Sequence, residues 1–189
     1  MYKICRTEQS ARRQQEMEEG LLTMMLEKPY DAITVSDLCN RLDLPRKSFY
    51  RYFGSKEDAL VGLLDRRLMG YETSNTHGTA MQSRGITLDL NWFFTFWQAQ
   101  KDLLDALECS GLSGILVQRA IHNSRRAEIF ACAPSGMSRA EMEMSTAFIV
   151  SGLMSIVLQW HHEGYRESPG AMAETAYRML NRPLVPNLK

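Results

Sequence analysis

Residues 30–60, YDAITVSDLCNRLDLPRKSFYRYFGSKEDAL, decide the fold of this chain. A helix is expected to start at Val35, because Thr34 and Asp37 have the spacing of a capping box, in which two side chains satisfy free backbone amides. Apolar residues then recur at i, i+3, i+4 and i+7, which lie on one helix face; they are Val35, Leu38, Cys39 and Leu42. The pattern predicts a short helix that ends at about residues 41–42.

A second short helix is expected later in the same stretch. Pro45 suits the first turn of a helix, and Gly54 ends it. Phe49 and Phe53 are four residues apart, so both should point inward. A short helix, a turn and a second short helix form the helix-turn-helix arrangement, in which the second helix presents its N-terminal residues to the bases of the DNA major groove.

Helical spacing continues on both sides of this pair. An amphipathic helix is expected over roughly residues 8–28, ended by Pro29. Ser55 and Asp58 repeat the capping-box spacing and start a further helix whose apolar face consists of Leu60, Leu63, Leu64 and Leu68. Residues 1–66 are therefore expected to form a three-helix helix-turn-helix DNA-binding head, with this further helix leading out of it.

The rest of the chain also predicts helices. Residues 72–87 are polar with two glycines and indicate a loop. Helices are expected at roughly residues 88–108, 112–131, 138–164 and 169–181, and few strand signals appear. The fold class is all-α, with residues 67–189 forming a larger C-terminal helical body.

Charge is informative only in its distribution. The 189 residues carry no net charge, but residues 41–56 hold one acid, Asp43, among the bases Arg41, Arg46, Lys47, Arg51 and Lys56. A basic cluster on a neutral chain suits binding to DNA phosphates. If Phe49 and Phe53 are buried, the residues on or beside the exposed face of that helix are Arg46, Lys47, Ser48, Tyr50 and Arg51.

These residue types commonly contact DNA: Arg and Lys bind guanine edges and phosphates, and hydroxyl groups bind phosphates. Lys56, at the start of the next helix, would add a cation beside free backbone amides, a combination that suits a phosphate. Spacing alone leaves an alternative open, a basic solvated helix within an all-α bundle.

Residues 30–60 resemble the DNA-binding domain of the tetracycline-repressor (TetR) family. Three features carry the resemblance: Thr34-Val35 at the start of the second helix, the aromatic residues at 49–53, and Ser-Lys-Glu-Asp at 55–58. The resemblance covers roughly residues 8–66, about a third of the chain. It implies a homodimer whose heads bind a double-stranded DNA operator and whose C-terminal bodies, residues 67–189 here, serve ligand sensing and dimerisation.

Carried over to this chain, the family's DNA contacts fall on Thr34, Ser36, Arg46, Lys47, Ser48, Tyr50, Tyr52 and Lys56. The chain departs from the family at Pro45-Arg46-Lys47, where relatives often have Ser followed by a small residue. A hydroxyl cap is missing there, and charge and stiffness are added at the end of the helix that reads bases. The departure bears on the target sequence rather than on DNA binding.

Residues 147–160 are apolar almost all round, which is typical of a helix buried on more than one side. With Met172, Ala176 and Met179 they could form half of a four-helix dimer interface; the alternative is the monomer's own core. The spacing of Phe148, Gly152, Trp160 and Gly164 resembles a C-terminal subgroup, the dihydroxyacetone-kinase regulators.

Five rings crowd six positions, Trp92 to Trp97, and cannot all face one side of a helix. Trp92, Phe93, Phe96 and Trp97 are candidates to line a pocket for a small-molecule effector, although core packing would also explain each ring. Two hypotheses follow: a ligand-responsive repressor, or an adaptor of the same fold whose body binds a partner protein. Exposure of Trp92, Phe94 or Trp97 on a patch would favour the adaptor, and a closed aromatic cavity the repressor.

Several other classes of function find no support. No nucleophile elbow, phosphate-binding loop or H-E-x-x-H motif occurs, so neither an enzyme nor a cofactor is expected. His161-His162-Glu163 lacks ligand spacing, so no metal site is expected. The four cysteines, Cys5, Cys39, Cys109 and Cys132, are scattered and indicate free thiols. Without a signal peptide, and with residues 147–160 too short for a bilayer of about 30 Å, we expect a cytoplasmic protein without membrane association.

Overall fold

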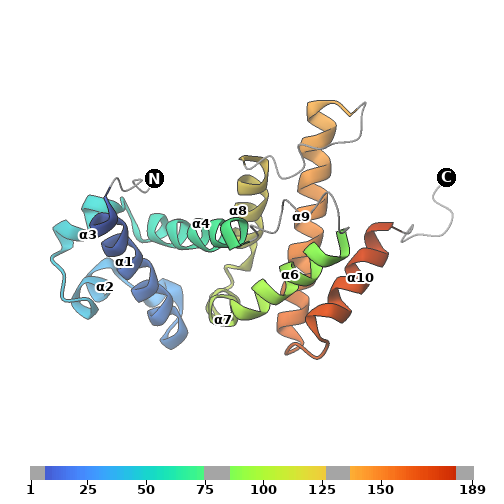
Figure 1. Cartoon of the computed structure of the whole chain (residues 1–189). Helices are drawn as coiled ribbons and strands as arrows, with labels where there is room; N and C mark the ends of the chain where they lie inside the picture. Colours follow the sequence, from blue (N-terminus) through green and yellow to red (C-terminus); the bar gives the residue numbers. More distant parts are fainter. Residues whose placement is uncertain (1–6, 75–85, 127–136, 182–189) are drawn as a thin grey trace. The chain divides into compact units, whose positions relative to one another are not determined.

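The computed structural model describes residues 7–74, 86–126 and 137–181. Every regular element within these ranges is a helix, which confirms the all-α prediction (Figure 1). The chain divides into two compact units. The first unit comprises Met1–Leu68 with Asp102–Arg119, and the second comprises Met69–Lys101 with Ala120–Lys189.

Helix α1 (Glu8–Glu27) confirms the first predicted helix. Its N-terminus is capped by Thr7, whose hydroxyl accepts a hydrogen bond from the amide of Ser10 at 3.3 Å. Because its apolar residues recur at helical spacing, one face is buried in the first unit, and that face includes Met17, Leu21, Met24 and Met25. The helix ends just before Pro29, which cannot continue it.

A single 3₁₀ turn, η1 (Tyr30–Ala32), leads into the two short helices α2 (Val35–Arg41) and α3 (Arg46–Tyr52). The predicted capping box is confirmed at α2. Thr34 Oγ1 accepts from the amide of Asp37 at 3.1 Å, and Asp37 Oδ2 accepts from the amide of Thr34 at 3.0 Å. Local side chains therefore fix where α2 begins.

The turn between α2 and α3 passes through a left-handed residue, Asp43, with φ of 49°. The amide of Leu44 closes the turn on the carbonyl of Cys39 at 2.9 Å. Pro45 caps α3 without any side-chain hydrogen bond, as its departure from the family pattern predicted. The helix itself starts at Arg46, one residue after the predicted proline.

Helix α4 (Lys56–Ser74) begins with a variant of the predicted cap. Ser55 Oγ accepts from the amide of Asp58 at 3.2 Å, and Asp58 Oδ2 accepts from the amide of Gly54 at 3.1 Å. The predicted leucine face of α4 is buried, as Leu60, Leu63, Leu64 and Leu68 show. Because α4 runs through Ser74 and α6 begins at Ile86, the predicted loop at 72–87 is too long at both ends; residues 75–85 lie outside the described ranges.

Ionic contacts bind three successive α4 residues into the first unit. Asp65 pairs with Arg119 of α8 (Ser113–Arg126) through two hydrogen bonds of 2.8 and 2.7 Å. Arg66 pairs with Glu18 on α1, and Arg67 pairs with Glu19 on the same helix. The Asp65–Arg119 pair joins α8 to α4, and the two arginine pairs join α4 to α1. The predicted 66–67 domain boundary falls within α4.

The predicted single helix at 88–108 is wrong, because two helices occupy this stretch. α6 (Ile86–Ala99) ends where the amide of Gln100 turns back to the carbonyl of Trp97 at 3.1 Å, and α7 (Lys101–Cys109) follows. The two helices bury their apolar faces in different units, so the chain breaks between them. α8 is described to Arg126, and residues 127–131 of the predicted helix 112–131 lie outside the described ranges.

In the second unit, α6 packs on α10 (Pro169–Asn181) and on α9 (Arg139–His162) (Figure 1). The predicted helices at 138–164 and 169–181 are confirmed. Phe94 of α6 meets Trp160 of α9 edge to face, with ring centroids 5.7 Å apart. Trp160 also donates its indole N–H to the carbonyl of Glu167 at 3.0 Å, which secures the connection to α10.

Helix α9 is not buried all round within this chain. Met154, Val157 and Trp160 are buried, but Met144 and Phe148 are 63% and 73% exposed. The apolar segment 147–160 by itself is too short to predict a membrane span. The helix that contains this segment has 24 residues and is longer. By length and composition it could cross a membrane, with a mean hydropathy of 1.4 over 18 residues, and it is the one such helix within the described ranges.

Candidate nucleic-acid interface

The exposed face of α3 is set by two buried phenylalanines. Phe49 and Phe53 are each 1% exposed, and their ring centroids lie 5.3 Å apart. Burial of both rings fixes the rotation of this two-turn helix, because residues four apart share a face. The opposite face is exposed and carries Arg46, Lys47, Tyr50 and Arg51.

Arg46 and Tyr50 form a contact along this face. Arg46 Nη2 donates to the Tyr50 hydroxyl at 3.3 Å, and the guanidinium carbon lies 5.9 Å from the centre of the tyrosine ring. The Tyr50 ring in turn meets Phe49 edge to face at 5.5 Å. A buried ring thus supports Tyr50, and Tyr50 supports a cation at the N-terminal end of α3.

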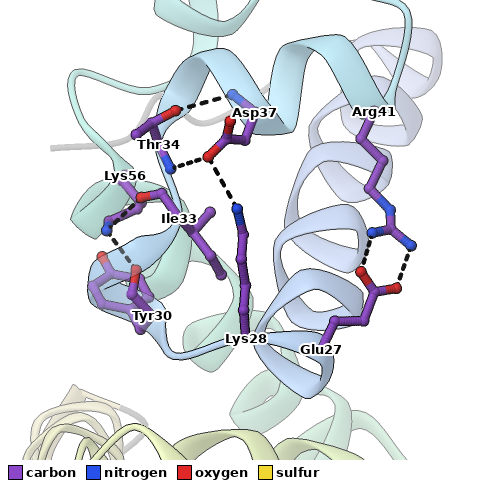
Figure 2. A network of polar contacts seen from close by, with 8 residues as sticks. All are labelled: Glu27, Lys28, Tyr30, Ile33, Thr34, Asp37, Arg41 and Lys56. Atoms are coloured by element: carbon purple, nitrogen blue, oxygen red, sulfur yellow. Dashed lines mark hydrogen bonds and ion pairs between the residues drawn. The ribbon is translucent and has the colours of Figure 1, made fainter.

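Two other cations of the basic cluster have partners inside the protein (Figure 2). Arg41 at the end of α2 makes a two-pronged ion pair with Glu27 of α1, with one N–O distance of 2.6 Å. Lys56 Nζ donates to the carbonyls of Tyr30 and Ile33, both at 2.7 Å. Arg41 and Lys56 both belong to the basic cluster predicted from the sequence. Their partners lie 14 to 26 residues away along the chain.

A third cation, Lys28, holds the start of α2. Its ammonium lies 3.1 Å from Asp37 Oδ2, the same oxygen that accepts from the amide of Thr34 (Figure 2). The backbone hydrogen bond from Thr34, followed by the hydrogen bond from Lys28, lowers the pKa of Asp37 below its ordinary value. The carboxylate therefore stays ionised at neutral pH and keeps the first turn of α2 in place.

The cations of α3 differ from these three. Among the described residues, Arg46, Lys47 and Arg51 form no ion pair, and all three are exposed. Three unpaired positive charges on one face of a helix after a tight turn can bind phosphates and base edges. This combination of geometry and charge makes α3 the candidate reading helix.

The other residues predicted to contact DNA differ in how exposed they are. Thr34 is exposed at the start of α2, whereas Ser36, Ser48, Tyr52 and Lys56 are half-buried. The hydroxyl of Thr34 already caps α2, and Lys56 already holds two carbonyls. Local spacing predicted the partner of Thr34, because Asp37 is only three residues away. It could not reveal the partners of Lys56, because these depend on how distant elements pack.

The four aromatic candidates for a ligand site lie in the second unit. Trp97 is 1% exposed and Phe93 9%, while Trp92 and Phe96 are half-buried. Phe93 and Phe96 both meet the ring of Tyr71, at 5.8 and 5.3 Å. Ring contacts therefore link Tyr71, Phe93, Phe96 and Trp97; with Trp92, which precedes Phe93 on α6, they are called here the aromatic cluster.

Two indole groups of the aromatic cluster lack a hydrogen-bond partner. The Nε1–H groups of Trp92 and Trp97 are buried and, within the described parts of the chain, donate to no acceptor. A buried donor without an acceptor costs about 1–3 kcal/mol, so each of these two groups needs a physical explanation. By contrast, the indole of Trp160 donates to a backbone carbonyl.

Other candidate chemistry is scarce in the described ranges. No group of three or more His, Cys, Asp or Glu residues there could hold a metal ion. His161 Nδ1 lies 3.0 Å from the hydroxyl of Tyr165, which gives this histidine a structural partner. Cys39 is a free, buried thiol whose pKa is raised by burial, and Cys109 is free and exposed. Cys5 and Cys132 lie outside the described residues.

Family profiles match both halves of the chain. A profile described as bacterial regulatory proteins of the tetR family matches residues 20–61, which contain α2 and α3. A second profile, described as a transcriptional regulator C-terminal region, matches residues 125–182. No curated protein matches the chain.

Solved structures with the same fold cover nearly the whole chain. The fatty acid degradation regulator FadR from Bacillus halodurans is 14% identical, with a TM-score of 0.58 over 90% of this chain and 95% of that one. The dihydroxyacetone kinase operon activator DhaS is 15% identical, with a TM-score of 0.59 over 89% and 93%. A TetR-family regulator from Syntrophomonas wolfei is 15% identical, with a TM-score of 0.59 over 94% and 99%. These likenesses show the fold.

Proposed function

The chain belongs to the TetR family of bacterial regulatory proteins, which are DNA-binding transcriptional regulators rather than enzymes, and we propose that it is a ligand-responsive repressor that binds its operator as a homodimer in the cytoplasm. The observation that carries this proposal is the exposed face of α3, where Arg46, Lys47 and Arg51 form no ion pair with any described residue.

The operator surface consists of both short helices. Arg46, Lys47 and Arg51 supply charge on α3, where the first two stand at the end that enters the groove. Hydroxyl groups add phosphate contacts around them, from Thr34, Ser36, Ser48, Tyr50 and Tyr52. Arg46 at the uncapped start of α3 is the residue placed best to read a guanine edge.

Selection of bound fragments from genomic DNA tests this proposal, followed by binding measurements on the recovered duplex. Lys47→Ala and Tyr50→Ala should each weaken binding by about 10-fold, in line with the loss of one good DNA contact of about 1–3 kcal/mol. Arg139→Ala is a matched control, because Arg139 is a 91% exposed arginine on α9. Unchanged affinity in both α3 variants would contradict the proposed surface.

An exposed apolar strip on α9 supports the homodimer. Met144 and Phe148 lie on the same face as Gly152, Ser155 and Gln159, all exposed. The small residues of this strip let a second helix approach closely. Exposed Tyr177 and Met179 on α10 add apolar surface in the same unit, whereas Ala176, predicted for the interface, is fully buried inside the unit. Two heads in a dimer would address operator half-sites about 34–36 Å apart.

The aromatic cluster supports a small-molecule effector. Its rings are apolar, and among the described residues two of its buried polar groups lack a partner, the donors Trp92 Nε1–H and Trp97 Nε1–H. We therefore expect an apolar effector that offers a hydrogen-bond acceptor such as a carbonyl or ether oxygen. A thermal-shift screen of such compounds tests this expectation, with Trp97→Phe as the variant that should lose the shift. Trp160→Phe is the control, because the indole of Trp160 already donates to Glu167.

The adaptor alternative predicted an exposed aromatic patch formed by Trp92, Phe94 or Trp97. Phe94 and Trp97 are buried, at 0% and 1% exposure, and Trp92 is half-buried. Rings turned into their own unit offer little surface to a partner protein. The burial of these rings therefore supports a ligand within the body over a protein partner bound through them.

A further inference from the structure

The ammonium of Lys56, at the first residue of α4, is enclosed by the connection between α1 and α2 (Figure 2). Nζ donates to the carbonyl oxygens of Tyr30 and Ile33, each at 2.7 Å. It also lies 3.9 Å from the centre of the Tyr30 ring. Two of the three ammonium N–H groups are thus used, and an aromatic face covers the charge.

The partners of Lys56 cannot easily move away. Tyr30 is 6% exposed and Ile33 is 1% exposed, so both side chains are anchored in the core of the first unit. The amide of Ile33 also donates to the Tyr30 carbonyl at 3.0 Å within η1. Hydrogen bonds from a charged donor are stronger than neutral ones, and a cation over a ring adds further attraction.

The held segment leads directly into the candidate DNA-binding surface. Ile33 is followed by Thr34, the cap of α2, whose amide is bound by Asp37. Asp37 is in turn bound by Lys28. Two lysines therefore fasten the start of α2, one through the backbone of the connection and the other through the capping carboxylate.

We propose that Lys56 is a positioning residue, whose ammonium fixes the 30–33 connection against the start of α4 and so places Thr34 and Ser36 for DNA, instead of binding a phosphate itself. This inference rests on the proposed DNA-binding function. It changes the sequence-based prediction for Lys56, because an ammonium held by two carbonyls and a ring is already desolvated on those sides.

Salt dependence separates the two roles of Lys56. Loss of a phosphate contact lowers the slope of log affinity against log salt concentration by about 0.9 for each contact. Lys56→Met keeps the aliphatic stem but removes the charge and all N–H donors. It should lower affinity for the genomically selected duplex by about 10-fold at every KCl concentration, with an unchanged slope.

Lys47→Met is the matched control, because Lys47 is exposed on α3 and forms no ion pair in the part of the chain that the structure describes. It should lower the slope by about 0.9 per contact. Tyr30→Leu removes the ring beneath the ammonium without altering any proposed DNA contact. It should weaken binding, and its effect should not add to that of Lys56→Met, because both act through the same connection.

The outcomes distinguish the inference from the function on which it rests. A wild-type protein that binds no duplex overturns both. Normal wild-type binding with a reduced slope in Lys56→Met, or with unchanged affinity in that variant, overturns the positioning role alone. Circular dichroism verifies folding of each variant. If Lys56→Met does not fold, Lys56→Gln keeps amide donors without charge, and a reduced slope there would equally overturn the inference.

Discussion

Helices α1 and α9 are both long, but they depart from the usual distribution of side chains in opposite ways. On α1 a carboxylate is fully buried: Glu18 is 0% exposed. On α9 an aromatic ring is outside: Phe148 is 73% exposed. Glu18 has partners within the chain, since Arg66 pairs with it and Gln14 donates a hydrogen bond to it at 3.1 Å.

The Phe148 ring is not covered by any described residue, and Met144, one turn earlier on the same helix, is exposed as well. The difference indicates that the buried charge of Glu18 is neutralised inside the first unit, while α9 exposes a surface suited to a second molecule. A dimeric DNA-binding regulator needs a rigid head and a surface for a second copy, because two heads must lie at the spacing of two operator half-sites. Four changes would break or sharpen this comparison.

Phe148→Glu should have the largest effect. A charge on each facing α9 strip would replace an apolar contact by repulsion, so we expect dimer affinity to fall by about 100-fold or more. Sedimentation velocity at micromolar concentration measures it. Leu26→Glu is the control, because Leu26 is a 48% exposed apolar residue on α1. A wild-type monomer, or a Phe148→Glu dimer as stable as wild type, would contradict the α9 interface.

Glu18→Ala should destabilise the first unit by about 2 kcal/mol. Breaking a buried ion pair costs about 3–5 kcal/mol, but Arg66 is 31% exposed and regains part of its hydration. Urea unfolding measures the change. In Glu16→Ala, the lost pair with Arg13 is exposed, so the expected cost stays below about 0.5 kcal/mol. Equal effects in the two variants would show that Glu18 acts as a surface charge.

Glu18→Gln tests the same group through pH. Burial raises the pKa of Glu18 even though Arg66 opposes it, so between its unfolded and folded pKa values the folded protein holds a proton that the unfolded chain has released. Stability from Glu18 is therefore full below its ordinary pKa of 4.5 and is lost as pH rises through the folded pKa. Glutamine has no such loss.

The stability deficit of Glu18→Gln relative to wild type should accordingly shrink between pH 4.5 and pH 7.5, as followed by urea unfolding at both values. The depressed pKa of Asp37 acts in the opposite sense, because its contribution is lost as pH falls. That contribution is common to both proteins and cancels in the difference. A deficit that grows with pH would show that Arg66 outweighs the burial of Glu18.

Asp43→Gly should have the smallest effect. Asp43 adopts φ of 49° in the turn before α3, a conformation that glycine adopts without steric cost. We expect a gain of about 0.5 kcal/mol in stability, visible as a small rise in melting temperature. Removal of the one acid within residues 41–56 should also strengthen DNA binding at low salt. Asp43→Ala is the contrasting variant and should lower the melting temperature.

The sequence predicted the local elements of the first unit well. Capping residues and apolar spacing act within four residues of one another, so Thr34, Asp37 and the pair Phe49 and Phe53 could be assigned from their order alone. The break between α6 and α7 was missed for the opposite reason: neither glycine nor proline marks Gln100. The chain breaks there because the two helices bury their faces in different units.

What the sequence by itself determined is therefore the helix-turn-helix and the cations available to it, since both depend on neighbouring residues. Only the tertiary structure decided which cations remain free. Arg41 and Lys56 find Glu27 and the Tyr30–Ile33 carbonyls across long stretches of chain. Arg46, Lys47 and Arg51 on α3 form no ion pair within the described ranges, and Phe148 is exposed on α9. Pairing and burial are properties of packing, and packing joins residues that sequence order keeps apart.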